Sequence, residues 1–168
     1  MYVREGVRLA GDAIMNGNDL ILADGTAPRI SAETVSVASY AVDSHSTRRL
    51  ANEYAAGQWR AWNEGNFEAT TGGSDIAAPI PLEICVPKAS ECRNLAVGFA
   101  VSATHVAFGA IRMEFTAMQI GQSMGQAAAQ AIASGTTIQD LDYSAVRTAL
   151  LASASPPGEV APVLPQVN

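Results

Sequence analysis

The stretch from residue 94 to residue 134 constrains the fold more than any other part of this 168-residue chain. Its first part, Leu95 to Val101, is short, apolar and partly β-branched, which is typical of a strand buried on both faces. Ser102 to His105 follow as a small, polar turn, and the sequence from about Arg112 to Ser134 predicts one helix. Open α/β sheets bind ligands at the carboxyl end of a strand that leads into a helix. The order of these elements therefore predicts an α/β fold with a ligand site at this turn.

The predicted helix carries small residues on one face. Gly121, Gly125 and Ala129 lie four positions apart, so they share a face that has almost no side-chain bulk. Two glycines inside a helix lower its intrinsic stability, which suggests that close approach is worth this cost. A backbone or a cofactor can approach such a face. The free N–H groups and the positive dipole end at the start of the helix favour an electron-rich or anionic ligand.

Two segments of this region resemble a known family. They are Ser-Ala-Thr-His-Val-Ala-Phe-Gly-Ala-Ile-Arg-Met-Glu (102–114) and Gly-Gln-Ser-Met-Gly-Gln-Ala-Ala (121–128). They resemble the C-terminal flavin-binding segment of FAD-dependent oxidoreductases, in which S-A-T-H-x-A-x-G-[SA]-I-R precedes a G-Q-x-x-G helix. Two positions depart from the pattern: Phe115 stands where relatives often have proline, and Ser123-Met124 replaces a pair of alanines.

The resemblance implies that FAD is the cofactor and that the helix start lies against the isoalloxazine ring. The residues that it implies for flavin contact are Thr104, His105, Gly109, Ala110, Ile111, Arg112, Met113 and Glu114. Two interpretations stay open for His105, which either holds the turn by bonding to local backbone or contacts flavin and substrate. Arg112 opposes the dipole at a helix start, so it predicts a compensating anion. Glu114, a carboxylate from elsewhere and a group on the ligand are the three candidates.

A second element, Asp-Ser-His-Ser-Thr-Arg-Arg at 43–49, resembles the D-S-H-x-x-x-R element that approaches the substrate side of the flavin in this family. The resemblance implies that Asp43, His45 and Arg48 contact the substrate and that His45 and His105 are catalytic. A carboxylate can orient an imidazole, and an arginine can clamp an anionic group. The alternative is that Asp43 caps a turn and His45 is an ordinary surface residue.

Weaker patterns mark the rest of the chain. Alternation of residue types predicts half-buried strands over residues 2–12 and 35–42. Prolines restrict residues 79–88 to an edge or extended segment. Residues 138–151 predict a short amphipathic helix, with Ser134-Gly135 ending the helix before it.

Residues 50–72 have no clear pattern. If Trp59 and Trp62 lie on a helical turn they share a face, as a packing patch or as a platform for an aromatic or carbohydrate substrate. The glycines that follow predict a mobile loop.

These features predict three segments. Residues 1–88 form a β-rich substrate-side segment, residues 89–152 form the C-terminal part of a Rossmann-like FAD-binding domain, and residues 153–168 form a proline-rich tail. A dinucleotide-binding domain also needs a strand, a G-x-G-x-x-G turn and a helix, and the sequence contains no such turn. We therefore expect the chain to be a fragment or a split subunit. Its expected partner is an N-terminal FAD-binding half, another chain or a second copy of itself.

Composition excludes several classes. The net charge of −6 argues against binding to nucleic acid or to an anionic membrane surface. Neither a membrane-spanning run nor a signal peptide is predicted, so we expect a soluble chain and favour the cytoplasm. Cys85 and Cys92 lack the further ligands of a metal site; we interpret them as buried thiols, although a disulfide stays possible.

The sequence thus supports an FAD-dependent oxidoreductase that oxidises a small organic substrate at a C–H next to an OH or NH, with hydride transfer to flavin. The alternative is a non-catalytic structural or interaction subunit derived from the same fold. A serine hydrolase is set aside because Ser44, between Asp43 and His45, cannot converge with its direct neighbours on one point.

Overall fold

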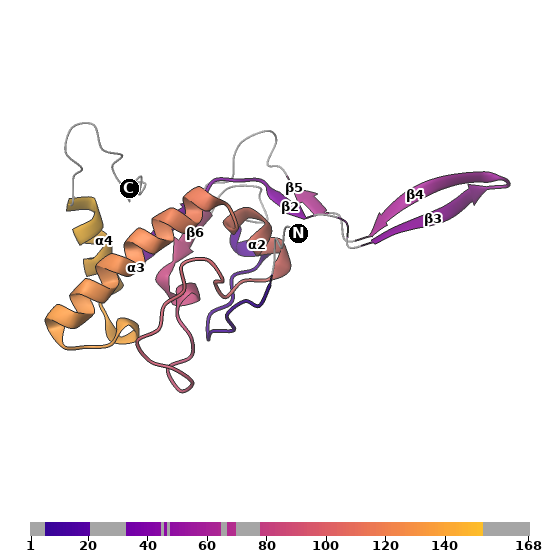
Figure 1. Cartoon of the computed structure of the whole chain (residues 1–168). Coiled ribbons are helices and arrows are strands. Elements are labelled where there is room, and N and C mark those ends of the chain that lie inside the picture. Colours follow the sequence, from indigo (N-terminus) through magenta and orange to yellow (C-terminus); the bar gives the residue numbers. More distant parts are fainter. Residues whose placement is uncertain are drawn as a thin grey trace.

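The computed structural model describes residues 6–20, 33–44, 46, 48–64, 67–69 and 78–152, and the side chains of all of these except 44 and 67–69. The fold mixes helices and strands, as an α/β class requires (Figure 1). In chain order the elements are α1 (Gly17–Leu20), β1 (Thr34–Ala38), β2 (Val42–Ser44), β3 (Arg48–Ala55), β4 (Gln58–Glu64), β5 (Phe67–Ala69), β6 (Ala78–Pro81), the 3₁₀ turn η1 (Leu82–Cys85), α2 (His105–Ile111), α3 (Glu114–Ser134), the 3₁₀ turn η2 (Ile138–Asp140) and α4 (Tyr143–Ala152).

The strands pair two by two and antiparallel: β1 with β6, β2 with β5, and β3 with β4. The β1–β6 pair lies in the core, and α3 and α4 pack against β1 (Figure 1). All five residues of β1 are buried, as expected for a strand covered on both faces. Its apolar residues belong to a core cluster whose other members come from distant parts of the chain and include Ile80, Phe108, Ile120 and Val146.

Side chains of the two helices satisfy the edge of β1 that faces away from β6. The Val37 N–H donates to Gln119 Oε1 at 3.2 Å, and the Ser123 hydroxyl donates to the Val35 carbonyl. The Arg147 guanidinium donates to the Thr34 carbonyl at 3.0 Å, and burial lowers the pKa of this arginine. Buried backbone groups must be paired, so these contacts replace a third strand among the described residues.

The strand predicted over Leu95 to Val101 is wrong, because this segment is irregular. Its backbone bonds connect to η1 and to the N-terminal loop: the Val97 N–H donates to the Cys85 carbonyl at 2.8 Å, and the Leu9 N–H donates to the Ala100 carbonyl at 2.9 Å. Only an isolated parallel bridge, between Met15 and Ala103, follows it in the described part of the chain. An apolar run reports burial, but a strand also needs a neighbouring strand to pair with.

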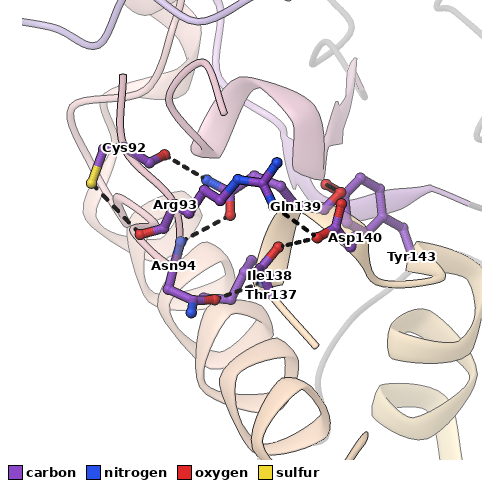
Figure 2. Close-up of polar contacts among 8 residues, drawn as sticks. All are labelled: Cys92, Arg93, Asn94, Thr137, Ile138, Gln139, Asp140 and Tyr143. Carbon is purple, nitrogen blue, oxygen red and sulfur yellow. Dashed lines mark hydrogen bonds and ion pairs between the residues drawn. The ribbon is translucent and has the colours of Figure 1, made fainter. Parts of the chain in front are cut away.

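A polar network fixes the start of this segment (Figure 2). Asn94 has a positive φ of 57°, which asparagine tolerates better than most residues. Its N–H donates to Gln139 Oε1 at 3.0 Å, and its Oδ1 accepts from the Ile138 N–H at 3.1 Å. The Gln139 side chain also donates to the Cys92 carbonyl at 3.0 Å. The loop before residue 95 is thereby tied to η2, which follows α3.

The helix predicted from about Arg112 to Ser134 is confirmed as α3, and a further helix, α2, precedes it. α2 begins at His105, inside the predicted polar turn, and the helical conformation is interrupted at Arg112 and Met113 before α3 begins. The predicted end is confirmed: Gly135 follows Ser134 with φ 67°, and its N–H bonds to carbonyls of the last turn.

Several other expectations changed in detail. Described residues 6–12 contain no strand, and the predicted strand at 35–42 is divided between β1 and β2. The helix predicted at 138–151 is confirmed as η2 followed by α4. The predicted tail at 153–168 lies outside the described residues.

Trp59 and Trp62 lie on β4 and not on a helical turn. Side chains three apart on a strand point to opposite faces, so the two indoles do not form one patch. Cys85 is buried as expected, whereas Cys92 is exposed, and both are free thiols. No described helix combines the length and apolarity that a membrane crossing requires.

Candidate functional site

The first part of the site is the start of α2. Thr104 is the N-cap residue: its hydroxyl oxygen accepts a hydrogen bond from the Ala107 N–H at 3.3 Å. The Thr104 N–H in turn donates to the Met15 carbonyl at 2.8 Å, which anchors this end of the helix to the N-terminal loop. The side chains of Thr104 and His105 are both exposed here.

The second part is the contact between α2 and β2. Gly109 lies directly on the backbone of Asp43: a Cβ at this position would be 2.8 Å from the Asp43 carbonyl oxygen and 3.3 Å from its N and C atoms. Real Cβ atoms essentially never lie within 3.0 Å of such a neighbour. Only glycine therefore allows the helix to approach the strand this closely.

This approach brings together Asp43 and Arg112. Arg112 lies three residues after Gly109, on the same side of α2, and its Nη2 is 2.9 Å from Asp43 Oδ2. The Arg112 side chain is only 8% exposed, and the Asp43 side chain is 34% exposed. A guanidinium this deeply buried requires an anion, and the structure supplies Asp43 in place of Glu114. The Tyr40 ring lies on the same guanidinium, with its centroid 5.8 Å from Cζ.

The ion pair with Asp43 leaves one N–H group of the Arg112 guanidinium without a described partner. Arg112 Nε is buried and has no hydrogen-bond partner within the part of the chain that the structure describes. An unpaired buried donor costs about 1–3 kcal/mol, and more when it is charged. Arg112 therefore keeps one buried N–H that no described residue satisfies.

The predicted flavin-contacting residues fall into two groups. Gly109, Ala110 and Ile111 are buried in the core of the chain itself. Thr104, His105 and Glu114 are exposed, and Arg112 and Met113 are partly exposed. Thr104 and Arg112 lie at opposite ends of α2, about 12 Å apart at the rise of an α-helix. They do not converge on one point, but an extended ligand can reach both.

The predicted substrate-contacting residues are not brought together among the described residues. Asp43 pairs with Arg112, whereas Arg48 forms an ion pair with Glu64 at the base of the β3–β4 hairpin. This hydrogen bond to Glu64 raises the pKa of Arg48. Figure 1 shows the hairpin projecting away from α2. His45 lies outside the described residues.

Sequence analysis missed Tyr40. A signal for it exists, because Tyr40 is the only large residue between β1 and β2 and so lies directly before the D-S-H element.

Comparison with known proteins defines the class of protein. The family model described as "FAD dependent oxidoreductase" matches residues 1–150, so the chain belongs to this family of flavoproteins, and the predicted family is confirmed. The family is FAD-dependent, which confirms the predicted cofactor. No curated protein and no solved structure matches the chain.

Proposed function

We propose that the chain supplies the flavin-contacting and substrate-side elements of an enzyme that oxidises a small organic molecule at a C–H next to an OH or NH. The observation that carries this proposal is the buried Arg112, which Asp43 holds on one side and whose Nε–H is left unpaired. Membership of the FAD-dependent oxidoreductase family agrees with it.

The residues present fit a flavin. The isoalloxazine ring is planar, extended and rich in hydrogen-bond acceptors, which suits a buried guanidinium with a spare donor. Arg112 would donate to the ring, Thr104 and His105 would contact it from the start of α2, and Met113 and Glu114 would border it. Gly109, Ala110 and Ile111 would set the position of this helix through their packing. When bound, FAD supplies the acceptor for the hydride that leaves the substrate.

The residues of this chain would have separate tasks in that reaction. Asp43 would hold the Arg112 guanidinium in place. Removal of a hydride from a C–H next to an OH or NH also releases a proton, and a histidine is suited to take it. His45 and His105 are our candidates for this proton, and Arg48 is the candidate for an anionic group on the substrate.

The chain would need a second component. Its sequence has no G-x-G-x-x-G turn, so the pyrophosphate of FAD would be bound by another segment or another chain. This predicts that the chain by itself recognises the ring portion of the cofactor.

The test is a titration of the chain with FAD and with riboflavin, which has the ring but no pyrophosphate, followed by flavin fluorescence. We expect similar affinities for the two, because the chain contributes contacts to the ring only. Arg112→Met should weaken both by tenfold or more, since a hydrogen bond from a charged group contributes about 1.5–3 kcal/mol. Arg60→Met, which removes an exposed arginine from the hairpin, is the matched control and should change neither.

Equal affinity of the parent and Arg112→Met would refute the role of Arg112. If neither flavin binds to a chain that folds normally, the alternative of a non-catalytic interaction subunit is favoured.

A further inference from the structure

Phe99 is an exposed aromatic residue on a backbone that other parts of the chain hold in place. The carbonyl of the next residue, Ala100, accepts a hydrogen bond from the Leu9 N–H at 2.9 Å. On the other side, Gly98 lies against α3, since a Cβ there would be 3.8 Å from Gly121 Cα. The Phe99 side chain is nevertheless 47% exposed. A contact residue that is already held in position loses little conformational entropy when it binds a ligand.

Phe99 packs against the central part of α2. Its ring centroid is 5.5 Å from that of Phe108, with the two planes 80° apart, which is a favoured edge-to-face arrangement. The Arg8 guanidinium lies over the same Phe108 ring, with Cζ 5.3 Å from the centroid. Phe108 itself is only 1% exposed. Phe99 and Arg8 are therefore two of the side chains that a ligand on this side of α2 would meet in its place.

This cluster lies between the two ends of the candidate flavin site. Phe108 is three residues after His105 and four residues before Arg112, so the three residues share one side of α2 and follow each other by about one turn. The proposed function has the flavin in contact with His105 at one end and with Arg112 at the other. A planar ligand that reaches both must cross the side of the helix on which Phe99 packs.

We propose that Phe99 is a stacking residue for the isoalloxazine ring, with the Arg8 guanidinium beside it. This inference rests on the proposed function and adds two contact residues to its flavin site. A flat heteroaromatic ring packs favourably against an aromatic side chain, and a guanidinium suits its electron-rich edge and carbonyl oxygens. Phe99 would supply the apolar contact that the polar residues at the two ends of α2 do not.

Titration of the full chain with riboflavin tests the affinity. Phe99→Ala should weaken binding at least fivefold, because it removes the stacking surface. Phe99→Trp keeps an aromatic ring at this position and should bind about as tightly as the parent. Leu95→Ala is the matched control, because Leu95 belongs to the same segment, is 44% exposed and directly follows Asn94, which is tied to η2. It should leave the affinity unchanged.

Flavin emission supplies a readout that a merely structural role of Phe99 would not change. An indole in direct contact with an excited flavin quenches its emission by rapid electron transfer. Riboflavin bound to Phe99→Trp should therefore emit less than riboflavin bound to the parent chain. Leu95→Trp should give the emission of the parent. Circular dichroism of each variant checks that the chain is folded.

The outcomes separate this inference from the proposed function. If the parent chain binds riboflavin and Phe99→Ala binds it equally well, the role of Phe99 is refuted and the proposed function stands. If Phe99→Ala weakens binding but Phe99→Trp quenches no more than Leu95→Trp, Phe99 supports α2 and does not stack on the ring, which also overturns the inference. If the folded parent chain binds no flavin, both proposals fail.

Discussion

The substitution Gly109→Ala tests the contact on which the candidate site depends. The added Cβ would lie 2.8 Å from the Asp43 carbonyl oxygen and 3.3 Å from two further backbone atoms of β2. None of these atoms belongs to a flexible side chain, so the clash is relieved only if α2 and β2 move apart. The same movement would lengthen the Arg112–Asp43 ion pair of 2.9 Å.

The change in the free energy of unfolding caused by Gly109→Ala is the sum of two opposing contributions. Inserting a methyl group where the surroundings cannot yield costs about 1–3 kcal/mol. Alanine in place of glycine inside a helix returns about 0.5–1 kcal/mol. The net loss is therefore about 0–2.5 kcal/mol, centred near 1 kcal/mol, and each kcal/mol lowers the melting temperature of a chain of this size by roughly 2–4 °C. Separation of the buried ion pair would add to this loss.

Urea unfolding followed by circular dichroism measures the effect. Gly125→Ala in α3 is the matched control, because a Cβ there has no atom within 4 Å and should stabilise the helix by about 0.5–1 kcal/mol. The two glycine-to-alanine changes should thus have opposite signs. If Gly109→Ala is as stable as Gly125→Ala, the close approach of α2 to β2 is not present in solution.

Two further predictions concern stability. Ser123→Ala removes the hydroxyl that donates to the Val35 carbonyl and leaves that carbonyl buried, so the free energy of unfolding should fall by about 1–3 kcal/mol. The control Ser134→Ala, at an exposed position of the same helix, should lower it by less than about 0.5 kcal/mol. Equal losses for the two variants would contradict the role of Ser123. Burial raises the pKa of the Cys85 thiol to about 12, so a thiol reagent should label one cysteine, Cys92, in the native protein and both after unfolding. Because the folded state resists losing the Cys85 proton, stability should be unaffected by this group below pH 9 and should fall as the pH rises from 9 towards 12, and Cys85→Ala should remove that part of the pH dependence.

The helices could be predicted well because their signals are local. The length of α3, its end at Gly135 and the helix after it follow from periodicity and from turn chemistry that neighbouring residues determine. The sequence analysis does not predict α2, because it takes Ser102 to His105 as a turn, although threonine is also a preferred N-cap residue.

Pairing between distant segments could not be predicted in this way. The apolar run at 95–101 indicates burial, but the sequence does not identify its neighbours, and among the described residues its backbone bonds go to η1 and a loop and not to a strand. The need of Arg112 for an anion was predicted, but three candidates were left open. Asp43 is 69 residues away, and only the close packing of Gly109 on β2 selects it.

The β3–β4 hairpin was not predicted from the sequence, for a different reason. Polar and aromatic residues in 50–64 show no clear alternation, and the spacing of Trp59 and Trp62 places them on one face only if the segment is helical. A local signal for the turn was present in Gly57, which has φ 72° between the two strands. Both faces of this hairpin are exposed, so neither face is required to be apolar, which is why its pattern is weak.

The position of Arg112 connects the stability of this fold to its proposed use of flavin. Arg112 ends α2, its partner Asp43 lies on β2, and Gly109 holds the two elements together. A ligand that accepts a hydrogen bond from Arg112 Nε would therefore bind better when β2 is in place, and its binding would stabilise that arrangement in return. On this reasoning Gly109→Ala weakens flavin binding through the packing of Gly109 on β2. An effect on flavin affinity therefore identifies a contact residue only when the stability of the same variant has been measured.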